Sequence, residues 1–351
     1  MAMSTVSCGA PPPEPKAPEP PPVAAPAAAA EDPCKSSDLA PCRAACDRGG
    51  ADACFRLGAR LLYGQEVAKD PVGSVAPLGK ACEAGRQDAC TLLAAQYFAG
   101  EGVKADLPRA ITLVKRACEA KVAEACLLLA GAYASGGGVE ADLAQGVRLT
   151  DKACELGNAQ ACGASAAFLL AGVGGPPDEA HAARAARMAC SHDDPTGCTI
   201  LGKLLLDGES TPHDPAKGVE MLARACDGNF AAACTEIGLV LTHGRGVPAD
   251  PARGTFAYQR GCDLGDLKAC NNFADAYEQG AGVPKDYDRA LRMYRDICAK
   301  GGAFACGNVG NMTYLGRGVR ADKKQGAAKL REACKTEPFW CKRLDEYKEK
   351  R

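Results

Sequence analysis

Residues 82–118 read CEAGRQDACTLLAAQYFAGEGVKADLPRAITLVKRAC, and this stretch decides the fold because its cysteines recur along the chain. The first cysteine of the stretch belongs to a series with a constant spacing of 36 residues: Cys46, Cys82, Cys118, Cys154, Cys190, Cys226, Cys262, Cys298 and Cys334. A fixed period in the thirties is typical of stacked helix pairs, whose units contact mainly their neighbours. The sequence therefore predicts an all-α solenoid of about eight helix-pair repeats. This architecture favours a binding scaffold over an enzyme.

All but the last of these cysteines are followed eight positions later by another. In an unbroken helix, residues eight apart lie about 12 Å apart, beyond the roughly 7 Å Cα separation that a disulfide tolerates. A turn must intervene, and glycines such as Gly49, Gly85 and Gly157 stand three residues after the first cysteine in most units. Asp193 and Asn229 stand at this position in two other units and also suit a left-handed cap, whereas Lys121 is the exception. Each pair is therefore expected to tie the end of one helix to the start of the next.

Pairing the cysteines locally predicts ten disulfides. The expected pairs are Cys34 with Cys42, Cys46 with Cys54, Cys82 with Cys90, Cys118 with Cys126, Cys154 with Cys162, Cys190 with Cys198, Cys226 with Cys234, Cys262 with Cys270, Cys298 with Cys306, and Cys334 with Cys341. Metal binding is the alternative, although zinc sites usually combine C-x2-C pairs or histidines, and four histidines stand here against 21 cysteines. Such dense disulfide usage favours an oxidising compartment outside the cytoplasm, as in a periplasm, an outer envelope or a secreted protein.

One cysteine, Cys8, has no local partner. It stands in Thr5-Val6-Ser7-Cys8-Gly9 ahead of a tract rich in proline and alanine, which resembles the lipidation site and tether of a bacterial lipoprotein. Thr5 stands where leucine is usual, and no apolar segment precedes it. A secreted chain with an odd thiol and an intracellular chain are the alternatives. We expect residues 1–33 to form a tether and extended linker, 34–341 the solenoid, and 342–351 a charged capping helix.

Each unit also carries the signals of two helices. A small residue follows the second cysteine by four positions, as at Ala94 and Gly238, and lets helices approach closely. A loop such as Gly100-Glu-Gly102-Val103 comes next, and an aspartate follows it in every unit. Several of these aspartates precede proline, so they fit the N-cap of the second helix better than a row of calcium ligands.

These residues carry a family resemblance. A helix, a G-x-G-V loop, an aspartate, a second helix and A-C-E-x-G resemble the Sel1-like repeat, a relative of the tetratricopeptide repeat, and one C-x7-C pair per unit resembles the Helicobacter cysteine-rich protein branch. The resemblance implies a secreted or envelope solenoid with protein-interaction roles, and also weak binding and hydrolysis of β-lactams. The residues give the enzymatic reading little support, because no S-x-x-K, K-T-G or H-E-x-x-H motif occurs. We assign no catalytic residue and no cofactor.

The fourth and fifth units depart most from the consensus, with Ser165 in place of an apolar residue. The four histidines, His181, His192, His213 and His243, fall there or in the next loop, so this region is a candidate ligand or metal site, with simple repeat drift as the alternative. A net charge of −1 without a basic block argues against nucleic acid. The expected partner is a protein or peptide on the concave face. A β-lactam hydrolase and a structural envelope lipoprotein attached through Cys8 are the alternatives.

Overall fold

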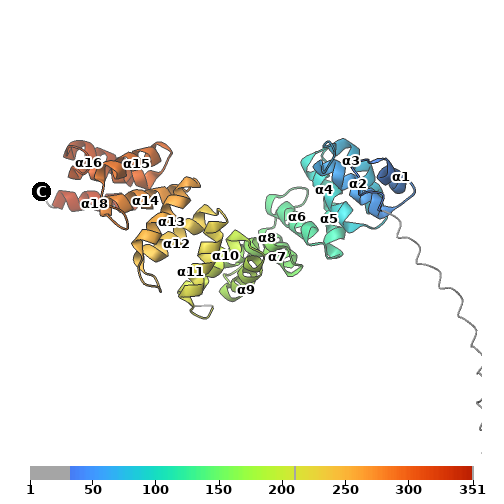
Figure 1. Cartoon of the computed structure of the whole chain (residues 1–351), viewed down its shortest axis with the longest axis horizontal. Helices are drawn as coiled ribbons and strands as arrows, with labels where there is room; N and C mark the ends of the chain where they lie inside the picture. The colour runs from blue at the N-terminus through green and yellow to red at the C-terminus, as the bar shows by residue number, and fades with distance from the viewer. Residues whose placement is uncertain (1–31, 209–210, 350–351) are drawn as a thin grey trace, which may run out of the picture.

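The computed structural model describes residues 32–208 and 211–349, and within these ranges every regular element is a helix. Figure 1 shows the helices following one another in an elongated, curved array whose first and last helices lie at opposite ends. The helices are α1 Ala40–Asp47, α2 Ala51–Tyr63, α3 Pro71–Glu83, α4 Gln87–Ala99, α5 Leu107–Glu119, α6 Ala123–Ser135, α7 Leu143–Glu155, α8 Ala159–Ala171, α9 Glu179–Ser191, α10 Pro195–Asp207, α11 Pro215–Asp227, α12 Ala231–His243, α13 Pro251–Asp263, α14 Leu267–Gln279, α15 Tyr287–Ala299, α16 Ala303–Leu315, α17 Lys323–Cys334 and α18 Pro338–Glu349. The predicted all-α solenoid is confirmed.

Even-numbered and odd-numbered helices occupy different sides of the array. Each even-numbered helix from α2 to α16, except α14, packs most extensively on the odd-numbered helix that follows it, and the next even-numbered helix packs on that one. Helix α14 packs about equally on α13 and α15. Four pairs of successive even-numbered helices also contact each other: α4 with α6, α8 with α10, α10 with α12, and α12 with α14. No two odd-numbered helices of the described residues pack together to that extent. Elements on the inside of a curve lie closer together, so the even-numbered helices line the inner face.

The ends of the helices follow the repeated sequence signals. Each odd-numbered helix from α3 to α17 begins after an aspartate whose side chain accepts a hydrogen bond from the backbone N–H three residues later, which confirms the predicted N-caps. Each even-numbered helix from α2 to α16 ends at a glycine in the left-handed conformation, such as Gly100 with φ 69°. At Gly238 a Cβ would meet the Tyr258 ring at 2.4 Å, so the small residue sets how closely α12 approaches α13.

Ten disulfides connect the end of an odd-numbered helix, or the segment before α1, to the start of the next element. Their Cα–Cα distances run from 4.4 to 4.9 Å. The bridge between Cys82 and Cys90, for example, joins α3 to α4 across a turn at Gly85. One disulfide per repeat, as expected from the cysteine spacing, is confirmed. Cys8 lies outside the described residues.

The last helix closes the C-terminal end of the core. It begins at Pro338, earlier than the boundary expected at residue 342, and therefore includes the second cysteine of the last bridge. Trp340 and Leu344 are buried in one cluster with Leu330 of α17. Lys342 and Glu346 are exposed on the same helix. The terminal helix therefore covers the last repeat with an apolar side and presents a polar side to solvent.

Candidate functional site

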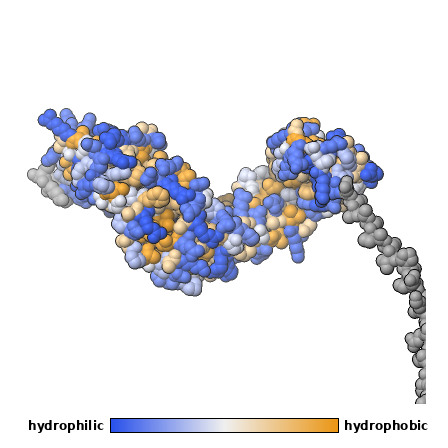
Figure 2. Space-filling view, viewed as in Figure 1, coloured by the Kyte–Doolittle hydropathy of each residue, from blue (hydrophilic) through white to orange (hydrophobic). Residues whose placement is uncertain are grey.

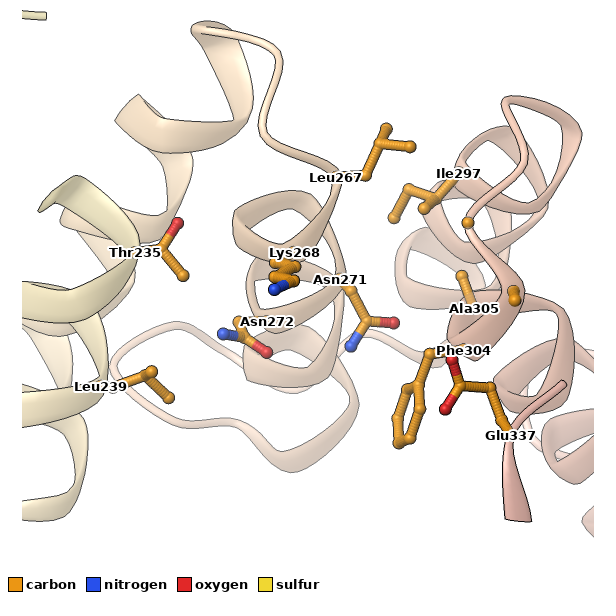
Figure 3. Close-up of a pocket in the computed structure, with 12 residues that line it drawn as sticks. Thr235, Leu239, Leu267, Lys268, Asn271, Asn272, Ile297, Phe304, Ala305 and Glu337 are labelled. Carbon is orange, nitrogen blue, oxygen red and sulfur yellow. The ribbon is translucent and has the colours of Figure 1, made fainter. Parts of the chain in front are cut away.

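A pocket of about 450 Å³ lies on the inner face of the C-terminal half of the array. Figure 3 shows its walls, which come mainly from α12, α14 and α16. Ile297 of α15, Gly302 of the turn before α16 and Glu337 of the turn before α18 complete the lining. The lining residues are Thr235, Leu239, Leu267, Lys268, Asn271, Asn272, Ile297, Gly302, Ala303, Phe304, Ala305 and Glu337. An apolar hollow with a few converging polar groups is the usual form of a ligand site in a protein.

The apolar part of the pocket consists of Leu239, Leu267, Ile297 and Phe304. Phe304 is 38% exposed, and its ring is held from behind by Trp340, with 5.0 Å between the ring centroids. At Gly302 a Cβ would lie 2.5 Å from the Ile297 side chain, so only glycine lets this turn approach α15 so closely. Phe304, packed on Trp340, therefore forms an aromatic side of the pocket, and Gly302 adds no side chain to the pocket just before α16.

Three side chains of α14 supply hydrogen-bond donors to the pocket. The Oδ1 atom of Asn271 accepts a hydrogen bond of 2.9 Å from Asn308 Nδ2, which links α14 to α16 and leaves Asn271 Nδ2 without a partner in the described chain. The Asn272 amide and the Lys268 ammonium group likewise have no hydrogen bond or ion pair within residues 32–208 and 211–349. These groups are free to bind an acceptor on a ligand.

Two carboxylates lie near these donors, and only one of them lacks a hydrogen-bond partner in the described structure. Asp266 accepts hydrogen bonds from the Lys268 backbone N–H at 2.8 Å and from Thr235 Oγ1 at 2.5 Å, so it caps α14 and ties that helix to α12. The Glu337 side chain has no hydrogen bond or ion pair with any described residue. Figure 3 shows Glu337 beside Phe304, on the opposite side of Asn271 from Lys268. The pocket therefore has an available cation toward one end and an available carboxylate toward the other.

A buried polar cluster fixes the far end of α14. Glu278 is 4% exposed, and it accepts hydrogen bonds from Arg317 at 2.7 Å and from the Tyr294 hydroxyl at 3.3 Å. Burial raises the pKa of Tyr294, and the carboxylates of Asp275 and Glu278 raise it further. The hydrogen bond to Glu278 raises the pKa of Arg317. The cluster joins α14 to α15 and to the loop after α16, so it holds the helix that carries the pocket donors.

The four histidines do not come together in one site. His181 Nε2 lies 3.2 Å from Asp151 Oδ1, whereas His243 Nδ1 lies 3.0 Å from the backbone oxygen of Leu239. His192 ends α9, and His213 lies in the loop before α11. No group of three His, Cys, Asp or Glu side chains in the described part of the chain is placed to hold a metal ion.

Ser165 and His181 share a partner and form no hydrogen bond with each other in the described structure. Ser165 is fully buried on α8 and donates a hydrogen bond of 2.8 Å to the same Asp151 oxygen that faces His181. In a hydrolytic triad the imidazole stands between the serine and the carboxylate. Here the carboxylate stands between the other two, so the arrangement differs from a triad, and the three residues join α7, α8 and α9.

Sequence reasoning did not single out the pocket residues on α14. A signal was present, because two asparagines, Asn271 and Asn272, directly follow Cys270, whereas the repeat with Cys126 carries Leu127 and Leu128 at these positions. Comparing the repeats position by position for polar residues next to the second cysteine would have found them.

The comparisons with known proteins agree with this architecture. The Sel1 repeat family model matches seven segments, residues 51–85, 87–122, 123–158, 195–230, 231–266, 267–301 and 303–334. The chain belongs to the Sel1 repeat family. The matched segments leave out residues 159–194, which contain Ser165 and His181. No curated protein matches the chain.

Solved Sel1 repeat structures share the fold. A protective antigen present in uropathogenic Escherichia coli strains is 23% identical, with 85% of this chain and 72% of that chain covered and a TM-score of 0.66. A Sel1 repeat protein from Oxalobacter formigenes is 24% identical, with 87% and 89% covered and a TM-score of 0.63. Helicobacter pylori cysteine rich protein B is 23% identical, with 38% and 97% covered and a TM-score of 0.30. At these identities the first two structures show the shared fold alone.

Proposed function

We propose that this Sel1 repeat scaffold binds a protein partner through an extended peptide segment that lies along its inner face. The observation that carries the proposal is the pocket between α12, α14 and α16, because it crosses three successive inner helices. A peptide running across the helices would therefore place one side chain in the pocket while its backbone meets the amides of Asn271 and Asn272. Stacked helix pairs commonly use such long concave surfaces for binding.

The array also offers apolar contact away from this pocket. A second hollow of about 210 Å³ lies between α6, α7 and α8, where Leu127, Val147 and Phe168 line it. Figure 2 shows apolar patches alternating with hydrophilic surface along the array. Several separated apolar contacts suit an extended segment better than a compact small molecule.

The binding proposal is tested by selecting peptides from a random displayed library on the oxidised protein. Asn272→Trp places an indole in the pocket, and we expect it to weaken the selected peptides by about tenfold or more, as expected when a central contact is lost. Glu220→Trp is the matched control, because this residue is exposed on the outer helix α11. Peptides that bind Asn272→Trp as tightly as the unchanged protein would place binding elsewhere, and a selection without enrichment would contradict the proposal.

We also propose that the solenoid works outside the cytoplasm and is attached to a membrane through a lipid on Cys8. The proposal is supported by the ten disulfides, which persist in oxidising compartments. None of the described helices is long and apolar enough to span a bilayer. Expressed with its upstream region, the protein should partition into detergent, and Cys8→Ser should move it to the soluble fraction. An alkylatable thiol at Cys8 in the intact protein would contradict the lipid anchor.

A further inference from the structure

We infer that the pocket between α12, α14 and α16 selects a peptide segment in which an acidic residue stands next to a bulky apolar residue. The inference rests on the proposed function and specifies the chemistry of the partner. In this arrangement the apolar side chain fills the hollow beside Phe304, and the carboxylate pairs with the Lys268 ammonium group.

The pocket's donors favour an anionic ligand group. Lys268 Nζ, Asn271 Nδ2 and the Asn272 amide all lack partners in the described chain, and all three belong to one helix at the same pocket. Asn271 Oδ1 already accepts a hydrogen bond from Asn308, whereas its Nδ2 group has no acceptor among the described residues. A carboxylate accepts several hydrogen bonds, and a bond between an ammonium group and a carboxylate is stronger than one between neutral groups.

Two nearby acidic residues differ in what they offer a ligand, and the position of Glu337 sets the direction of the bound peptide. Asp266 has both oxygens engaged by Thr235 and by the α14 backbone. Glu337 is available but lies on the Phe304 side, where it would repel a carboxylate and attract backbone N–H groups or a basic residue. The acidic residue of the ligand is therefore placed over α14, and the chain then passes the aromatic wall toward α18.

The charge distribution of the chain supports the same partner. Residues 285–351 contain 17 lysines and arginines against nine aspartates and glutamates, an excess of eight positive charges in a chain of net charge −1. The rest of the chain is correspondingly acidic. A positive field around the last two repeats attracts an acidic segment toward this end of the inner face and repels a basic one.

The test uses four fluorescein-labelled peptides of the form Gly-Ser-Gly-X-Z-Gly-Ser-Gly, with the central pair Asp-Phe, Asn-Phe, Lys-Phe or Asp-Ala. Fluorescence anisotropy at low and high NaCl measures binding to the oxidised full chain. We expect the Asp-Phe peptide to bind about tenfold more tightly than each of the other three, with a preference over Lys-Phe that shrinks in high salt.

Charge reversal identifies the residue responsible. Lys268→Glu should reverse the preference, so that Lys-Phe binds more tightly than Asp-Phe. Lys115→Glu, at an exposed position on the outer helix α5, should leave the order unchanged. Equal binding of the Asp-Phe and Lys-Phe peptides, or an order that Lys268→Glu does not change, overturns the inference.

The outcomes separate this inference from the proposed function. If the selected library peptides depend on the pocket but show no enrichment of acidic residues next to apolar ones, the scaffold binds peptides and the inference is wrong. If neither the library nor the four peptides bind, both are wrong.

Discussion

At the scale of single residues, the turn between paired cysteines shows that the repeat imposes a conformation on whatever residue it contains. Gly85 and Gly157 adopt φ of 94° and 92°, as their residue type favours, yet Lys121 takes φ 65° at the same place. Asp193 and Asn229 do the same with φ 57° and 64°. The left-handed conformation costs a residue with a side chain roughly 1–2 kcal/mol. The disulfide and the two helices therefore determine this turn, while glycine only makes it easier.

Lys121→Gly should therefore increase the free energy of unfolding by about 1 kcal/mol, because it removes the strain of a left-handed lysine. Lys115→Gly is the matched control, since that lysine lies inside α5, where glycine should cost about 1 kcal/mol. Denaturant unfolding of the oxidised proteins measures both changes. A decrease in stability for Lys121→Gly would show that the lysine side chain makes contacts that outweigh the strain.

Two aspartates should respond to pH in opposite directions. The pKa of Asp88 is lowered mainly by its hydrogen bonds from Arg86, and burial partly opposes this shift. The pKa of Asp275 is raised mainly by loss of hydration, and the negative charge of Glu278 raises it further. Part of the Asp275 surface remains exposed. Asp88 therefore stabilises the fold above its ordinary pKa, and this stability is lost as the pH falls. Asp275 disfavours the fold once the pH rises through its raised pKa.

At pH 7 we expect Asp88→Asn to lower the melting temperature and Asp275→Asn to raise it, each by a modest amount because both sites are near the surface. Below the ordinary pKa of aspartate the differences should shrink, because Asp275 is then protonated in the folded and the unfolded chain. For Asp88 the difference shrinks as the pH falls from the ordinary pKa through its lowered pKa in the folded protein. Melting curves between pH 3 and 8 measure this. A constant Asp275→Asn difference across that range would show that the change acts through packing instead of charge.

At the scale of helices, the spacing of the cysteines, the loop glycines and the N-cap aspartates predicted the elements and their order. Those signals are local, and each acts within a few residues of the atoms it binds, as Asp106 does for the N–H of Arg109. The pocket was not predicted, because Leu239, Asn271 and Phe304 belong to three repeats and meet only through the curvature of the array. The four histidines drew attention because they are rare in the sequence. Rarity does not predict which side chains lie close together in the fold.

Removing single bridges should show how far neighbouring repeats depend on one another. The central pair Cys154→Ala with Cys162→Ala opens a ring of nine residues, which costs roughly 2.6 kcal/mol in the chain-entropy view. Because each helix contacts mainly its neighbours, we expect faster amide exchange in α7 and α8 and an unfolding transition in two steps. The terminal pair Cys334→Ala with Cys341→Ala should instead loosen α18 and leave one main transition. Uniformly faster exchange along the chain would contradict this local picture.

At the scale of the whole molecule, the charge is unevenly distributed along an elongated array. The last two repeats and the terminal helix are basic, although the net charge of the whole chain is −1. The excess of positive charge can be counted from the sequence. Only the fold shows that α14, α16 and the turn before α18 contribute to one pocket. A partner would be attracted to one end of the scaffold, and the remaining repeats would extend beyond it.

The disulfide between successive helices also gives the chain a mechanical property. Eight residue steps of extended chain span about 28 Å, yet each bridge holds its two Cα atoms within 5 Å, so about 24 Å of length cannot be drawn out at each bridge. A force applied between the two ends passes through every repeat in turn. In single-molecule stretching we expect the oxidised chain to stop well short of its full contour, and reductant to release the hidden length in increments of about 24 Å. The solenoid would thus behave as a spring with a built-in limit of travel.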